Sequence, residues 1–158
     1  MDGVVVARTL HILAVVIWIG GVSMATTVVI AAIRRGDLGS DRFKAFQTIE
    51  RRFVWQARAA VILVGLTGLY MTAELDLWDR FRMAEFWWMH AMVCLWLLFV
   101  FILFVAEPFI LHRRFHRWAT TAPDVAFAWL HRVHWILLTL ALITVFGAAA
   151  GSHGWLLF

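Results

Sequence analysis

The stretch RTLHILAVVIWIGG, at residues 8–21, decides the fold class of this protein. It belongs to an apolar run long enough to cross a bilayer, which takes roughly 20 residues of helix. Three further runs of the same kind follow it, with charged segments between them. The four spans are expected at about residues 4–33, 55–74, 84–111 and 125–150. The sequence therefore predicts a single-domain, all-α polytopic membrane protein, built as a four-transmembrane-helix bundle.

The composition excludes several functional classes. The chain of 158 residues is 63% hydrophobic, with a mean hydropathy of +0.83, whereas soluble proteins are nearer half apolar. Cys94 is the single cysteine, so membrane enzymes that work through paired cysteines are excluded. The high isoelectric point of about 10.6 comes from basic residues gathered between apolar runs. Because topology explains that pattern, we expect no nucleic-acid partner.

The charges between the spans predict the orientation. Residues 34–54 contain six Lys or Arg and residues 112–124 contain three, while residues 75–83 balance two Asp against two Arg. The positive-inside rule then places the first and third connections in the cytoplasm and both termini outside the inner membrane. Within the first connection, Phe43 and Phe46 begin an apolar stripe at spacings of three and four. This stripe predicts an amphipathic interfacial helix that runs into the second span.

Two histidines are predicted at the same depth in the membrane. His11 lies about seven residues into the first span and His90 about six into the third, and both spans enter from the outside. At about 1.5 Å of rise per residue, both rings lie roughly 10 Å below the outer interface. Intramembrane ionisable residues are functional candidates, and paired imidazoles across a bundle suit a bis-histidine haem. We therefore expect His11 and His90 to bind haem b through its iron.

Neighbours of His11 fit this interpretation. Trp18 lies on the same helical face and is expected to pack on the edge of the macrocycle. Arg8, one turn outward, is expected to pair with a haem propionate, because Arg binds carboxylates in a bidentate manner. The alternative is structural: His11 and His90 hydrogen-bond to each other or to carbonyl groups of neighbouring helices.

A copper site is the competing metal chemistry in the same region. Met83 and His90 share a face at a spacing of seven, and Cys94 follows one turn further on. Thioether and thiolate ligands favour Cu(I), so these three residues are the alternative metal site.

A second polar cluster is predicted at the inner end of the bundle. His131 and His134 share a face of the fourth span, and Glu107 precedes a proline near the inner end of the third. The alternatives for this cluster are a second haem, a proton path, a quinone headgroup site, or anchoring at the interface.

Short motifs resemble those of the HemJ/CopD group of small membrane proteins. LHILAVVIWIGG (10–21) resembles its first-helix signature, IERRFVWQARAAVILVGLTGLY (49–70) its Glu-Arg-Arg entry to the second helix, and FWWMHAMVCLWLLF (86–99) the third-helix segment of HemJ. HemJ proteins are haem-b-containing protoporphyrinogen oxidases, and CopD proteins are linked to copper uptake. The resemblance implies functional roles for His11 and His90, and inner-face roles for Glu50 and Arg51.

These observations lead to one main expectation and two alternatives. The main one is a b-type haem redox protein, an oxidoreductase if it acts as an enzyme, that exchanges electrons with a quinone, a porphyrinogen or a small oxidant. The alternatives are a copper-handling protein of the CopD kind and a non-catalytic membrane subunit. Expected partners are the lipid bilayer, a quinone or porphyrin, and a second copy of the chain against its exposed apolar faces.

Overall fold

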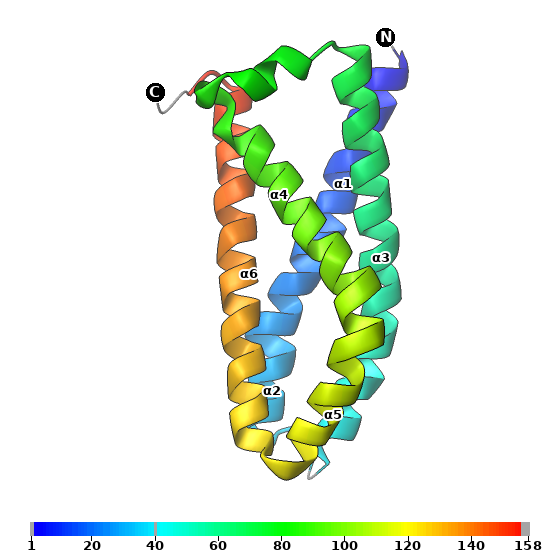
Figure 1. Ribbon diagram of the computed structural model, residues 1–158, viewed down its shortest axis with the longest axis vertical. Helices are drawn as coiled ribbons and strands as arrows, with labels where there is room; N and C mark the ends of the chain where they lie inside the picture. Colours follow the sequence, from blue (N-terminus) through cyan, green and yellow to red (C-terminus); the bar gives the residue numbers. More distant parts are fainter. Residues whose placement is uncertain (1, 40, 156–158) are drawn as a thin grey trace.

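The computed structural model describes residues 2–39 and 41–155, and for residues 110–114 and 116 the backbone only. The described part of the chain is almost entirely helical and contains no strand. Four long helical segments lie side by side, and both termini lie at the same end of the bundle (Figure 1). The all-α bundle expected from the sequence is confirmed.

The first half of the chain forms two long helical segments. α1 (Asp2–Met24), the π-helix η1 (Ala25–Val29) and α2 (Ile30–Arg35) follow one another without a break. Gly36 ends α2 with a φ of 82°, a left-handed conformation that costs glycine no steric strain. α3 (Arg42–Glu74) then returns along α1 and packs chiefly against it.

The second half forms the other two segments. The short 3-10 helices η2 (Trp78–Arg82) and η3 (Ala84–Phe86) lead into α4 (Trp87–Phe101). The π-helix η4 (Ile102–Leu111) and α5 (His112–Thr121) continue this segment. α6 (Pro123–Ser152) closes the bundle, with a proline in its first turn, where the missing N–H costs no hydrogen bond.

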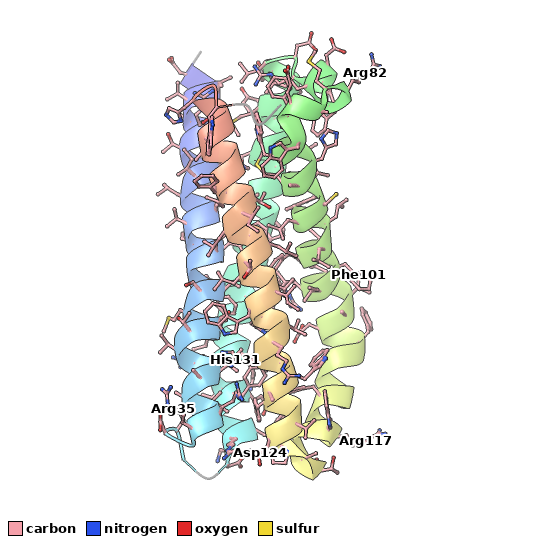
Figure 2. All side chains as sticks on the ribbon, turned by 90° about the vertical axis from the view of Figure 1, so that its left-hand side faces the viewer. Arg35, Arg82, Phe101, Arg117, Asp124 and His131 are labelled. Atoms are coloured by element: carbon pink, nitrogen blue, oxygen red, sulfur yellow. The ribbon has the colours of Figure 1, made fainter. Side chains whose placement is uncertain are left out.

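All four segments are long and apolar enough to cross a membrane. These stretches are Asp2–Arg35, Arg42–Glu74, Ala84–Phe109 and Pro123–Ser152. Each carries one of the expected spans, so the chain is a multi-pass membrane protein. Figure 2 places Arg35 and Asp124 at the opposite end of the bundle from Arg82.

The helices extend further than expected at the end of the bundle opposite the termini. The stripe expected to form an amphipathic helix that runs into the second span is the start of α3, which is helical without a break from Arg42. The connection expected at residues 112–124 is helical up to Thr121. Both segments stay helical because their aromatic rings meet: Phe46 lies 5.6 Å from Phe115 and 5.7 Å from Phe127, between ring centroids. These rings form a second, smaller core.

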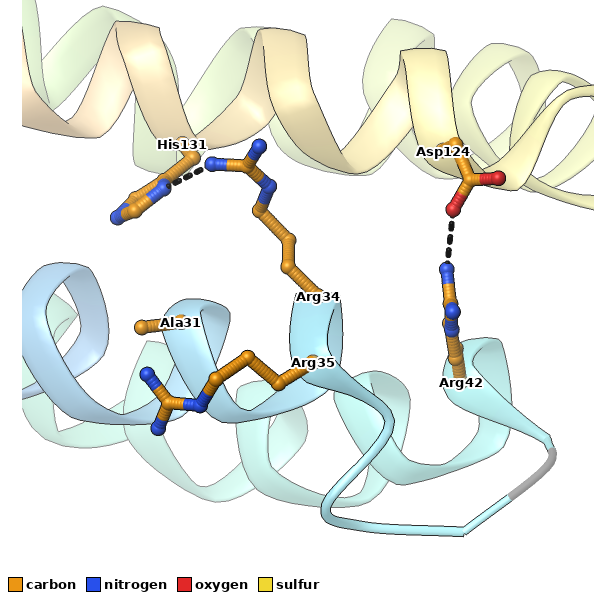
Figure 3. A pocket seen from close by; sticks show the side chains of 6 residues that line it. All are labelled: Ala31, Arg34, Arg35, Arg42, Asp124 and His131. Carbon is orange, nitrogen blue, oxygen red and sulfur yellow. Dashed lines mark hydrogen bonds and ion pairs between the residues drawn. The ribbon is translucent and has the colours of Figure 1, made fainter.

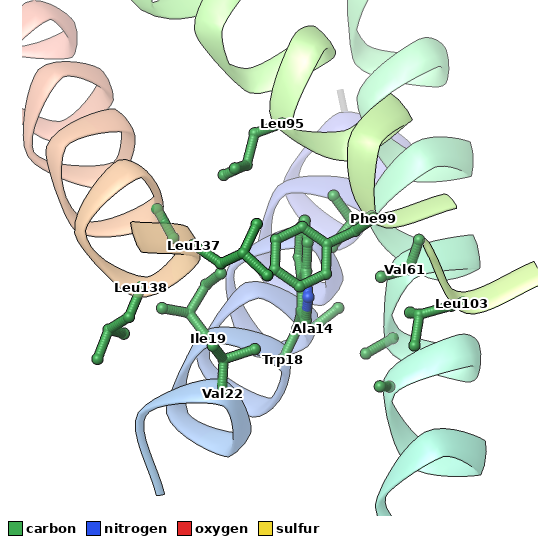
Figure 4. Close-up of a cluster of buried hydrophobic side chains, with 14 residues drawn as sticks. Ala14, Trp18, Ile19, Val22, Val61, Leu95, Phe99, Leu103, Leu137 and Leu138 are labelled. Carbon is green, nitrogen blue, oxygen red and sulfur yellow. The ribbon is translucent and has the colours of Figure 1, made fainter. Parts of the chain in front are cut away.

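The main core lies midway along the bundle (Figure 4). There Trp18 of α1 meets Phe99 of α4 edge to face, with ring centroids 4.8 Å apart. α4 crosses the bundle from α6 near the termini to α3 near the far end (Figure 1). Glycine permits this crossing: a Cβ at Gly65 of α3 would lie 2.5 Å from the ring of Trp96. At Gly151 of α6 a Cβ would meet an α4 ring just as closely.

Candidate functional site

His11 lies half-buried on α1 and faces α3. Its Nδ1 is 2.9 Å from Oγ1 of Thr67, and the Thr67 hydroxyl donates to the carbonyl of Leu63 at 2.6 Å. A hydroxyl has one proton, so while Thr67 donates to Leu63 it accepts the hydrogen bond from His11. In this arrangement the ring is protonated on Nδ1, and in the neutral ring Nε2 carries the lone pair.

The surroundings of this ring are made of small residues. Ala7 and Ala14, one turn to either side of His11 on its own helix, are buried. On α3, a Cβ at Gly68 would lie 3.5 Å from Cε1 of His11, in ordinary contact. Because the two nitrogens of an imidazole point to opposite sides, the Nε2 lone pair is directed away from Thr67.

Trp18 lies two turns along α1 from His11 and is 4% exposed. Its indole Nε1 is buried and has no hydrogen-bond partner among the described residues. An unpaired buried donor costs about 1–3 kcal/mol. Such groups are few in native proteins.

His90 lies on the exposed face of α4. Its Nε2 donates to the carbonyl of Phe81 at 2.9 Å, and the two rings meet edge to face with centroids 5.5 Å apart. Cys94, one turn further, is exposed on the same face. Among the described residues, no hydrogen bond or ring contact joins His11 to His90. The structure therefore does not bring the two rings into contact.

The alternative copper residues share this outward face. Met83, 44% exposed, precedes η3, while His90 and Cys94 are exposed on α4. Across the described residues, no group of three or more His, Cys, Asp and Glu side chains lies close enough together to hold a metal ion. Arg8, the expected propionate partner, is exposed one turn outward from His11.

Glu107, on η4, forms an ion pair with a residue that was not expected to be functional from the sequence. Nη2 of Arg58, on α3, is 2.7 Å from the Glu107 carboxylate, and both side chains are mostly buried. Arg58 also donates from Nε and Nη2 to the carbonyl of Leu103 in the same π-helix, at 3.0 and 2.8 Å. The signal was a lone arginine four residues into the expected second span, where a charge needs a partner.

The two inner histidines bond elsewhere. Nδ1 of His131 is 2.7 Å from Nη1 of Arg34, and Nε2 is 2.9 Å from the carbonyl of Thr26 in η1. His134 donates from Nδ1 to the carbonyl of Leu130, one turn back on α6, at 3.0 Å. None of these bonds reaches Glu107, and the cluster of His131, His134 and Glu107 stays a prediction.

No protein-family model, curated protein or solved structure matches this chain. The resemblance to the HemJ/CopD group stays a prediction drawn from short motifs. The geometry around His11 is therefore the observation that bears on function.

Proposed function

We propose that this protein is a membrane-embedded haem-binding redox protein, and that Nε2 of His11 is an axial ligand of a b-type haem. The observation that carries the proposal is the hydrogen bond from Nδ1 of His11 to Thr67. Histidines that bind metal ions almost always donate their other N–H to an acceptor, which sets the tautomer and raises the basicity of the ligand. Thr67 provides that acceptor here.

The residues that flank His11 are small. Alanine lies on both sides of His11 on α1, and Gly68 lies opposite its ring on α3. The unpaired Nε1 of Trp18 offers a buried donor on the same face of α1. Haem supplies one-electron chemistry, with its potential set by ligand and burial. The chain's own contribution is to hold the proton at Nδ1, direct Nε2, and exclude water at the α1–α3 interface.

The proposal depends on His11 alone. His90 stays the predicted second ligand. Because its ring lies on the exposed face of α4, this helix would have to turn about its axis before His11 and His90 could both bind the iron. Without that turn, His11 alone would hold the haem iron. As a haem-dependent oxidoreductase, the protein would exchange electrons with a quinone, a porphyrinogen or a small oxidant.

We further propose that it lies in the inner membrane with both termini outside, as its loop charges indicate.

The visible spectrum of the detergent-purified protein tests the proposal. The wild type is expected to show a Soret band that shifts on reduction, and His11→Ala is expected to abolish it. His153→Ala is the matched control, because His153 is an exposed histidine whose ring bonds within α6. Circular dichroism of each variant separates loss of haem from loss of fold.

The result for His90→Ala separates two coordination states. If His90 also ligates, its removal converts a low-spin spectrum into a high-spin one; if His11 ligates alone, the wild type is already high-spin. A wild type that binds stoichiometric copper and no haem, or a Soret band unchanged in His11→Ala, would overturn the proposal.

A further inference from the structure

A basic pocket opens at the end of the bundle opposite the termini. It has a volume of about 370 Å³ and lies between α2, the start of α3 and the start of α6. Figure 3 shows Arg34 reaching across it to His131, and Arg42 reaching to Asp124. Its lining residues are Ala31, Arg34, Arg35, Arg42, Asp124 and His131. None of them takes part in the site at His11.

The ion pairs of the pocket leave one positive charge without an acidic partner. Arg42 is paired with Asp124, and Nε of Arg35 is 2.9 Å from the carboxylate of Asp37. Among the described residues, Arg34 instead contacts an imidazole nitrogen, Nδ1 of His131. The net charge around the pocket is therefore positive, and it is concentrated on Arg34.

His131 holds Arg34 in place across the pocket. A guanidinium group has five N–H donors and no acceptor, so Nδ1 of His131 accepts the bond from Arg34. Nε2 of His131 lies 2.9 Å from the carbonyl of Thr26 and 3.0 Å from the indole Nε1 of Trp135, which donates to it. The histidine thus positions Arg34, whose further N–H donors are directed to the pocket for a ligand.

The backbone around the pocket also favours an anion. α3 begins at Arg42 and α6 at Pro123, so two long helices direct their N-termini toward this end. The free N–H groups and dipole of a helix N-terminus attract negative charge. Two carboxylates of the chain already use part of this field, because Asp41 caps α3 and Asp124 lies in the first turn of α6.

The position of the pocket along the bundle indicates where the anion comes from. The first membrane-spanning stretch ends at Arg35 and the fourth begins at Pro123, so the pocket lies where these two apolar helices end. Close to it, Val28 of η1 and Trp135 of α6 are 55% and 46% exposed. A lipid phosphate in the pocket would leave its acyl chains beside these exposed apolar side chains.

We propose that this pocket binds a phosphate group, held by Arg34 and carried by the headgroup of an anionic phospholipid. Guanidinium groups bind phosphate oxygens in a bidentate manner, and basic pockets between membrane-spanning helices suit anionic headgroups. The proposal is independent of haem binding at His11, which lies near the other end of the bundle.

Native mass spectrometry of the protein in neutral detergent tests the site, with bound phosphatidylglycerol as the measured species. Arg34→Gln is expected to weaken binding about fivefold or more, the effect of one basic residue near a lipid phosphate. Arg132→Gln is the matched control: Arg132 is exposed, follows His131 on α6 and lies outside the pocket. It is expected to change binding less than twofold.

A steric variant keeps the test informative if Arg34→Gln fails to fold. Ala31→Phe fills the pocket without changing its charge, and it is expected to block lipid binding equally well. Phosphatidylcholine with the same acyl chains is expected to bind at least fivefold more weakly. Inorganic phosphate that competes with the lipid in an Arg34-dependent way supports the site.

Three outcomes would overturn the proposal. Equal losses in Arg34→Gln and Arg132→Gln would mean that only general surface charge attracts the lipid. Lipid binding unchanged by Ala31→Phe would place the lipid elsewhere. Binding of inorganic phosphate without any binding of phosphatidylglycerol would overturn the lipid as the source of the phosphate.

Discussion

Replacing Thr67 with valine tests the link between local geometry and metal binding. The side chain is 6% exposed, and its hydroxyl lies between Nδ1 of His11 at 2.9 Å and the carbonyl of Leu63 at 2.6 Å. Valine has nearly the same shape and no hydroxyl, so Nδ1–H of His11 loses its acceptor. A net hydrogen bond of about 0.5–1.5 kcal/mol is lost, together with control of the tautomer.

The expected effect on haem is larger than the effect on folding. Loss of the hydrogen-bond partner of a ligating histidine typically weakens binding about 10- to 100-fold, or about 1.4–2.8 kcal/mol. The reduction potential is expected to become more positive, because a less basic imidazole stabilises Fe(III) less. Titration of haem into the apo-protein, followed at the Soret band, measures the affinity.

Two variants complete the design. Thr67→Ser keeps the hydroxyl and is expected to retain most of the affinity. Thr144→Val is the matched control, because the hydroxyl of Thr144 is equally buried and bonds only to the carbonyl of Leu140 within α6. If Thr67→Val binds haem as tightly as Thr144→Val does, the reasoning from the tautomer of His11 is refuted.

Three further predictions concern stability, measured by thermal unfolding in detergent. Gly65→Ala is expected to cost about 1–3 kcal/mol by overpacking against an α4 indole. Gly20→Ala is expected to be tolerated, because the added Cβ would have no heavy atom within 4 Å. Equal melting temperatures of the two variants would contradict the close packing of α4 on α3. Arg58→Gln is expected to destabilise more than Glu107→Gln, because Arg58 also donates twice to a backbone carbonyl; the reverse order would count against that network. Asp41→Ala removes the side chain that caps α3 and is expected to cost about 1 kcal/mol. An unchanged melting temperature would show that the cap does not stabilise the protein.

The positions of the spans could be predicted from the sequence because the bilayer imposes a strict rule. Backbone N–H and C=O groups have no water to bond with inside the membrane, so each apolar run of sufficient length must be a helix. The depths expected for His11 and His90 rest on the same rule and stay predictions. Sequence position also showed Arg58 inside a span, although only the structure supplied Glu107 as its partner.

The ends of the helices at the end of the bundle opposite the termini were harder to predict. Residues 112–121 carry many charges and were expected to form a connection, yet they continue the third helical segment as α5. Their helix is held by Phe115, which packs among rings contributed by α3 and α6. Contacts between residues so distant in the chain leave no periodic signal in either segment alone.

The sequence by itself determined that this is a four-span helical membrane protein. Only the tertiary structure decided which way each side chain turns. In water, the apolar stripe of a helix marks its buried face; in lipid, both faces are apolar, so α4 shows no such stripe. Packing alone therefore turns His11 toward Thr67 and leaves His90 on the outside of the bundle.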